Sequence, residues 1–284
     1  MSQFTERLDD AARRNQSLAC VGLDPWLPSM PIDDFAAFTK AIIDATCDLV
    51  CAYKPNYAFF EAQGLEGLQA LKATIESVPD GIPVILDAKR GDIGSTATAY
   101  AKATFEVWGA DAVTLNPYMG GDTLEPFLEY EDRGVFVLTR TSNPGGKDFE
   151  DLPIAYEESS RVGHAGVSRP LYEHVTERAV EWNSRGNIGL VVGATASDEL
   201  KRIRALAPSM PILIPGIGTQ GGDLESAIRY GTDNRGMRAV VNSSRGIIFA
   251  SKGPDFADAA RAATEHLRES INLVRAQAGY SWQS

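Results

Sequence analysis

The sequence has 284 residues, 44% of them hydrophobic, and a formal net charge of −11. This length suits one α/β barrel, which typically has about 250 residues, and it allows a large buried core. The acidic composition contains no Lys/Arg-dense stretch, which argues against a nucleic-acid-binding surface. No apolar run approaches the roughly 20 residues that a membrane-spanning helix needs.

The cysteines and histidines carry no metal-binding pattern. Cys20 and Cys51 lie inside apolar runs and are expected to be small buried hydrophobes, and Cys47 completes an odd count of three. No spacing among them, or among the three histidines, matches a zinc site. The odd count and the polar start of the sequence, which lacks a hydrophobic signal segment, predict a reducing cytoplasmic location.

Short apolar runs alternate with amphipathic patterns along the chain. The runs predict strands at 17–23, 49–54, 82–89, 112–116, 134–139, 187–193, 211–215 and 237–242. Because the runs are continuous rather than alternating, they are typical of parallel strands buried on both faces. Helical spacing predicts helices over 33–48, 95–108, 171–182, 198–206, 223–230 and 256–276. Strand–helix units without linkers predict one (β/α)8 TIM barrel domain over residues 1–284, with a doubly wound open sheet as the alternative.

A long connection follows the fifth predicted strand. Residues 140–168 contain Asn143-Pro144-Gly145-Gly146 and an acidic patch before the next helix begins. Connections of this length are usually functional or disordered, and barrels place their active sites in the loops that follow the strands. We therefore expect residues 140–168 to form an active-site lid or insertion.

Polar residues follow several predicted strands at their carboxyl ends. These residues are Asp24, Lys54, Asp87, Lys89, Asn116, Asn242, Ser243, Ser244 and Arg245. Strand ends are often polar because they are wet, so any single residue is weak evidence. In a barrel, however, the carboxyl ends of all strands converge on one opening, where these side chains would form a pocket of alternating charge.

The run Asp87-Ala88-Lys89-Arg90-Gly91-Asp92 is the most specific of these patterns. Asp87 and Lys89 are two residues apart, so they point the same way in an extended chain, and Lys54 on the adjacent strand can reach the same space. Two cations together with Asp87 and Asp92 would keep one another ionised. A structural salt-bridge network is the alternative. Buried ion pairs seldom improve stability over apolar packing, which favours a catalytic role.

Two segments predict phosphate binding. Residues 215–222 are rich in glycine and open a helix, so their backbone N–H groups can bind an anion. Residues 243–246 follow the last strand and contain Ser244, Arg245 and Gly246, in which Arg245 can hold phosphate oxygens with two donors. The first segment also matches G-x-G-x-x-G, but Asn242 stands where a dinucleotide fold needs an acid.

Residues 87–93 resemble the D-x-K-x-x-D signature of the orotidine 5′-phosphate decarboxylase superfamily, and the resemblance extends over residues 17–248. Magnesium-dependent sugar-phosphate decarboxylases and synthases share this signature, but they carry an acidic metal ligand where this chain has Lys54. The resemblance, closest to the longer bacterial type, therefore implies decarboxylation of orotidine 5′-monophosphate to uridine 5′-monophosphate, the last step of pyrimidine nucleotide biosynthesis. It implies no metal and no cofactor.

The resemblance also implies residue roles. Lys89 would donate a proton to C6 of the pyrimidine, with Asp87, Lys54 and Asp92 as the other catalytic residues. Asp92 and Thr96 would reach the neighbouring subunit's site in a homodimer. The implied substrate contacts are Asp24, Thr96, Ser142, Gln220 and Arg245.

Some alternatives remain open at this level. Which of Ser243 and Ser244 touches phosphate is undecided, and Asn116 stands where shorter family members often have histidine. A magnesium-dependent sugar-phosphate enzyme of the same superfamily is one alternative function. A Schiff-base aldolase with Lys54 or Lys89 as nucleophile, and a non-catalytic nucleotide-binding barrel, are the others.

Overall fold

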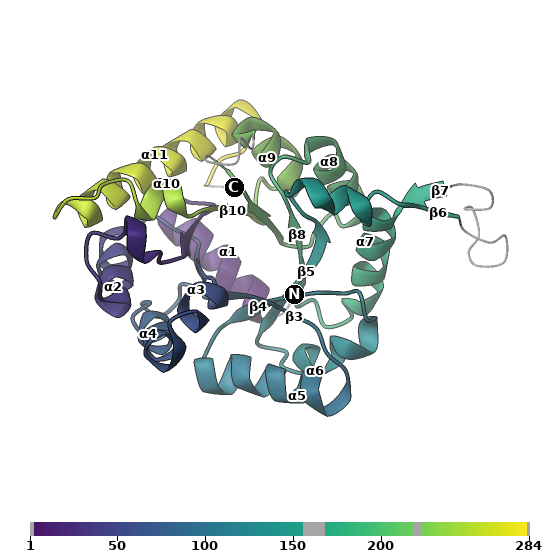
Figure 1. Cartoon of the computed structure of the whole chain (residues 1–284). Helices are drawn as coiled ribbons and strands as arrows, with labels where there is room; N and C mark the ends of the chain where they lie inside the picture. The colour runs from purple at the N-terminus through teal and green to yellow at the C-terminus, as the bar shows by residue number, and fades with distance from the viewer. Residues whose placement is uncertain (1–2, 156–167, 218–222, 283–284) are drawn as a thin grey trace.

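The computed structural model describes residues 3–155, 168–217 and 223–282. The barrel strands are β1 (Ala19–Leu23), β2 (Ala52–Pro55), β3 (Ile85–Arg90), β4 (Ala112–Leu115), β5 (Gly134–Arg140), β8 (Ile188–Val192), β9 (Ile212–Pro215) and β10 (Ala239–Ser243). These eight strands run parallel in the order β2, β1, β10, β9, β8, β5, β4, β3. Bridges from Tyr53 to Val84 and from Asn56 to Asp87 join the two end strands and close the ring (Figure 1). The predicted (β/α)8 barrel is therefore confirmed.

All eight barrel strands overlap the predicted apolar runs. Every residue of β1, β2, β4, β8 and β10 is buried, because one face of each strand lines the barrel interior and the other is covered by helices. This double burial is the physical reason why the runs are continuously apolar. Lys54 and Asn242 are polar exceptions near the carboxyl ends of β2 and β10, and both line the cavity there.

Six helices correspond to the predicted ones. They are α2 (Phe35–Thr46), α5 (Gly94–Lys102), α7 (Leu171–Trp182), α8 (Ser197–Leu206), α9 (Leu224–Gly231) and α11 (Phe256–Gln277). The sequence reading missed α1 (Gln3–Asn15), α3 (Tyr57–Glu61), α4 (Gly64–Glu76), α6 (Glu125–Leu128) and α10 (Arg245–Ile248). No helix within the described ranges is long and apolar enough to cross a membrane.

Helix α1 covers the amino-terminal end of the barrel and lies behind the ring of strands in Figure 1. Its Phe4 ring meets the Phe136 ring edge to face, with centroids 6.0 Å apart. Gly134 makes this packing possible, since a Cβ there would lie 2.4 Å from the Phe4 ring. With the amino-terminal end covered by α1, a ligand can approach the strand ends from the carboxyl end of the barrel.

The described part of the 140–168 connection begins with an anchored turn. Arg140 is buried, and its guanidinium lies 2.9 Å from Glu150 and 3.0 Å from Asp151. The connection continues into an antiparallel pair, β6 (Pro153–Ala155) and β7 (Ser168–Pro170), which projects outward from the ring in Figure 1. Residues 156–167 lie outside the described residues, so the lid role stays a prediction.

Candidate active site

Four charged side chains meet at the open end of the barrel, and we call Asp24, Lys54, Asp87 and Lys89 the mouth cluster. The Lys54 ammonium lies 2.9 Å from Asp87 Oδ2 and 3.9 Å from Asp24 Oδ1. The Lys89 ammonium lies 2.6 Å from Asp87 Oδ1. β2 and β3 are neighbours in the closed ring and β1 flanks β2, so three adjacent strand ends bring these residues together.

Lys54 and Asp87 of the mouth cluster keep their charges although both are largely buried. Burial alone would lower the pKa of Lys54, but the carboxylates of Asp87 and Asp24 outweigh it and raise this pKa above its usual value. Burial alone would raise the pKa of Asp87, but Lys54 and Lys89 hold it well below the usual range. The Lys54–Asp87 ion pair therefore persists at neutral pH.

A cavity of about 180 Å³ connects the mouth cluster to the segments predicted to bind phosphate. Asp24, Lys54 and Asp87 line it together with Ser244 and Arg245 at the start of α10. Gly22 makes room for this arrangement, because a Cβ there would lie 1.7 Å from Ser244 Oγ. The cavity can therefore take a ligand with a reactive group at the charged cluster and an anionic group at Arg245.

Two buried oxygens at this cavity have no hydrogen-bond partner among the described residues. They are Oδ1 of Asp24 and Oδ1 of Asn242, and both residues line the cavity. Buried polar atoms in proteins are nearly always paired. These acceptors therefore suit hydroxyl or N–H donors of a bound ligand.

Other predicted site residues lie apart from the mouth cluster or outside the description. Asp92 accepts a hydrogen bond from the Ile93 amide at 2.8 Å just before α5, and Thr96 is exposed on that helix. Within one chain, the second carboxylate beside Lys54 is thus Asp24 and not Asp92. Ser142 lies against the end of β8, where a Cβ at Gly193 would approach it within 2.7 Å. Gln220 lies outside the described residues, and Gly246 follows Arg245 in α10.

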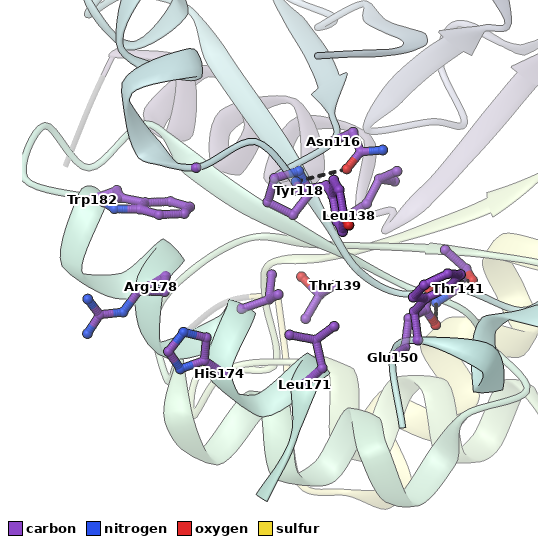
Figure 2. Close-up of a pocket in the computed structure, with 14 residues that line it drawn as sticks. Asn116, Tyr118, Leu138, Thr139, Thr141, Glu150, Leu171, His174, Arg178 and Trp182 are labelled. Atoms are coloured by element: carbon purple, nitrogen blue, oxygen red, sulfur yellow. Dashed lines mark hydrogen bonds between the residues drawn. The ribbon is translucent and has the colours of Figure 1, made fainter. Parts of the chain in front are cut away.

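The Asn116 side chain stabilises the turn that follows β4. Its Oδ1 accepts a hydrogen bond from the Tyr118 amide at 3.0 Å. It lines a second, larger cavity of about 680 Å³ beside the barrel, bordered by His174, Arg178 and Trp182 on α7 (Figure 2). Asn116 is therefore a turn residue here, although it stands at the end of a barrel strand.

Two polar residues at the site were missed by the sequence analysis. Asn56 lines the cavity just beyond β2, and Thr114 in the middle of β4 contacts Asp87. The available signal was weak in both cases. A threonine inside an apolar strand is common, and only the registration of β3 against β4 shows which residue it meets.

The cysteines behave as expected from their apolar surroundings. Cys20 and Cys51 are buried free thiols, and burial raises the pKa of Cys20 to about 12. Among the residues that the structure describes, no group of three or more His, Cys, Asp or Glu side chains is arranged to hold a metal ion. The carboxylates of the mouth cluster are instead placed beside lysine ammonium groups.

Comparisons with known proteins agree with this geometry. Residues 18–262 match the model of the orotidine 5′-phosphate decarboxylase / HUMPS family. The orotidine 5′-phosphate decarboxylase of Roseiflexus castenholzii is 52% identical over 95% of this chain and 98% of its own length, and that of Ralstonia nicotianae is 50% identical over 96% and 99%. The solved structure of Leishmania donovani OMP decarboxylase is 44% identical with a TM-score of 0.82, covering 97% of this chain and 99% of that one. The chain therefore belongs to the orotidine 5′-phosphate decarboxylase / HUMPS family.

Proposed function

We propose that this carboxy-lyase converts orotidine 5′-monophosphate to uridine 5′-monophosphate and CO2 without a metal or an organic cofactor. The observation that carries the proposal is the Lys54–Asp87–Lys89 contact at one end of a cavity that reaches Arg245. The decarboxylase names of relatives about half identical over nearly the whole chain support the same reaction.

The proposed chemistry centres on Lys89. The bond between C6 and the carboxylate breaks, its electron pair stays on C6, and CO2 leaves. No π-system of the pyrimidine conjugates with that electron pair, so the developing charge needs electrostatic stabilisation. The Lys89 ammonium would supply it and then transfer a proton to C6, after which the amine regains a proton from water. The half-exposed Lys89 side chain suits this exchange with solvent.

Asp87 is proposed to face the substrate carboxylate. Two like charges about 4 Å apart repel by roughly 4 kcal/mol at an effective dielectric constant near 20. This repulsion would ease as CO2 leaves, and Lys54 keeps Asp87 ionised until then. The repulsion of the substrate carboxylate and the ion pair with Lys54 both require an ionised Asp87, in agreement with its lowered pKa.

Substrate binding is proposed to come from Arg245 at the far end of the cavity and from Asp24 in the mouth cluster. Arg245 would hold the phosphate, with Ser244, Gly246 and Gln220 as further contacts, while Asp24 would bind a ribose hydroxyl. This remote binding energy can close the 140–168 segment, including Ser142, over the substrate. Asp92 and Thr96 would complete the site of a second subunit. The 62% exposed Ile93 between them suits burial in such a homodimer.

The test is the loss of orotidine 5′-monophosphate absorbance on adding the pure protein in EDTA. We expect turnover in EDTA by the wild type, no turnover by Lys89→Ala, and retained binding of uridine 5′-monophosphate by that variant. Loss of activity in EDTA would favour the magnesium-dependent branch, and trapping of a carbonyl substrate by borohydride would favour an aldolase. Normal turnover by Lys89→Ala would remove the proton-donor role.

A further inference from the structure

The backbone that carries Asp87 and Lys89 is irregular. β3 and β4 pair from Ile85 to Ala112 and from Leu86 to Val113, and pairing resumes only at Arg90 with Leu115. Residues 87–89 of β3 therefore stand opposite a single residue of β4, Thr114. In this bulge Lys89 has a φ of +45°, in the left-handed region that residues other than glycine seldom adopt. Such a conformation persists only where its surroundings hold it.

The Thr114 hydroxyl replaces backbone hydrogen bonds between β3 and β4 that are missing at the bulge. Its oxygen accepts hydrogen bonds from the amides of Ala88 at 3.1 Å and Lys89 at 2.9 Å. The hydroxyl donates to Asp87 Oδ1 at 3.0 Å, the oxygen that also accepts from the Lys89 ammonium at 2.6 Å. A hydroxyl has one donor and two acceptor positions, so all three are used here. The Thr114 side chain is 1% exposed, so water does not compete for them.

We propose that Thr114 is a positioning residue for catalysis, which fixes the Lys89 backbone and the Asp87 carboxylate in one arrangement. This inference rests on the proposed roles of Lys89 and Asp87. Both contacts end on one hydroxyl, so a rotation of Asp87 and a shift of the Lys89 main chain are coupled through it. Misplacement of a catalytic group by about 1 Å can cost roughly 100-fold in rate, although the misplaced group remains present.

If Thr114 positions the catalytic groups, its substitution should lower turnover and leave nucleotide binding nearly unchanged. Thr114→Val keeps the shape of the side chain but leaves the Ala88 and Lys89 amides without their acceptor, and Asp87 Oδ1 keeps only the hydrogen bond from the Lys89 ammonium. We expect kcat to fall about 100-fold, while affinity for uridine 5′-monophosphate changes less than about threefold, since Arg245 binds at the far end of the cavity. Thr114→Ser keeps the hydroxyl and should restore most of kcat.

The matched control is Thr176→Val. Thr176 is also fully buried, but its hydroxyl donates only to the Tyr172 carbonyl at 2.8 Å within α7. We expect an unchanged kcat for this variant. If Thr114→Val fails to fold, Thr114→Cys replaces it, because a thiol is a weak donor and acceptor and should also lower kcat.

Three outcomes decide the question. A low kcat with retained nucleotide binding in Thr114→Val, and recovery in Thr114→Ser, supports the positioning role. A normal kcat in Thr114→Val, or in its cysteine substitute, overturns it, as does a serine variant as slow as the valine variant. Normal turnover of Lys89→Ala would instead overturn the proposed role of Lys89, and an absence of turnover by the wild type would overturn the proposed function, so these failures are distinguishable.

Discussion

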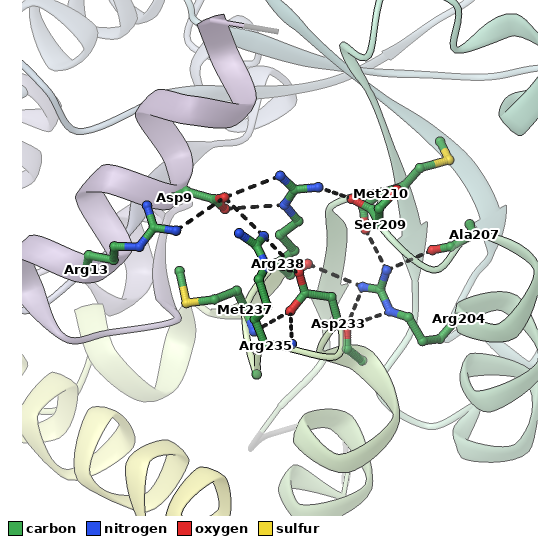
Figure 3. Close-up of polar contacts among 12 residues, drawn as sticks. Asp9, Arg13, Arg204, Ala207, Ser209, Met210, Asp233, Arg235, Met237 and Arg238 are labelled. Atoms are coloured by element: carbon green, nitrogen blue, oxygen red, sulfur yellow. Dashed lines mark hydrogen bonds and ion pairs between the residues drawn. The ribbon is translucent and has the colours of Figure 1, made fainter. Parts of the chain in front are cut away.

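The two ends of this barrel each carry a cluster of charged side chains, but the clusters differ in how completely their buried polar atoms are paired. At the amino-terminal end, Asp9, Asp233, Arg235 and Arg238 form what we call the floor cluster (Figure 3). Asp9 lies 3.3 Å from both Arg235 and Arg238, and Arg235 lies 2.9 Å from Asp233. None of its side-chain atoms is among the buried ones without a partner.

The mouth cluster is built differently. Asp24 Oδ1 and the nearby Asn242 Oδ1 are buried without a hydrogen bond, and a cavity adjoins them. Unpaired buried acceptors cost stability, so their retention at a cavity indicates ligand binding. Backbone strain does not distinguish the two clusters, because each contains a residue with a positive φ. This residue is Arg238 in the floor cluster, with a φ of +65°, and Lys89 in the mouth cluster, with a φ of +45°. The two clusters are thus alike in charge and in backbone strain, and they differ in the unsatisfied acceptors that adjoin the cavity at the mouth cluster.

The largest expected difference between the two clusters is in nucleotide affinity. Arg245→Ala removes the cation at the phosphate end of the cavity and should weaken affinity for uridine 5′-monophosphate about 100-fold. Affinity for uridine, which lacks the phosphate, should be unchanged. Titration calorimetry with both ligands measures the difference, and Arg235→Ala in the floor cluster is the matched control with unaltered affinity. Equal weakening for both ligands would contradict the phosphate assignment.

A smaller effect concerns the pH dependence of the floor cluster. Burial alone would raise the pKa of Asp233, but hydrogen bonds from the Met237 and Arg235 amides and from the Arg235 side chain lower it below its usual value. The Asp233 carboxylate therefore stabilises the fold above its ordinary pKa of about 3.9, and this contribution is lost as pH falls below that value. Asp233→Asn should accordingly be less stable than the wild type at neutral pH.

The stability gap between the wild type and Asp233→Asn should narrow as pH falls below about 3.9, because the unfolded chain takes up a proton on Asp233 before the folded protein does. Urea unfolding of both proteins at about pH 7 and about pH 2.5 measures this gap. A gap of constant size across this range would show that Asp233 does not act through its charge. Turnover at neutral pH should be the same in both proteins, because Asp233 lies at the closed end.

The sequence predicted the mouth better than the floor for a physical reason. Continuous apolar runs indicate strands, and the carboxyl ends of parallel strands converge. The sequence alone therefore predicts that Lys54, Asp87 and Lys89 lie close together. The floor cluster joins Asp9 to Arg238 across more than 200 residues and depends on α1, which was not predicted. The role of Thr114 depends on a register shift between β3 and β4, which no local pattern encodes.

The central claim is that the mouth cluster serves the substrate while the floor cluster stabilises the fold. A matched pair of Asp→Asn variants tests it, with the free energy of unfolding and kcat/KM measured for each. Asp24→Asn removes a carboxylate whose ion pair spans 3.9 Å, and Asp9→Asn removes one that lies 3.3 Å from both Arg235 and the buried Arg238.

The account predicts opposite outcomes for the two variants. Asp24→Asn should change the unfolding free energy by less than about 1 kcal/mol and lower kcat/KM about 100-fold, because a ribose hydroxyl then meets a neutral amide in place of a charged carboxylate acceptor. Asp9→Asn should lower the unfolding free energy by about 3 kcal/mol and leave kcat/KM unchanged. Equal losses of stability in both variants, or impaired turnover in a stable Asp9→Asn protein, would contradict the account.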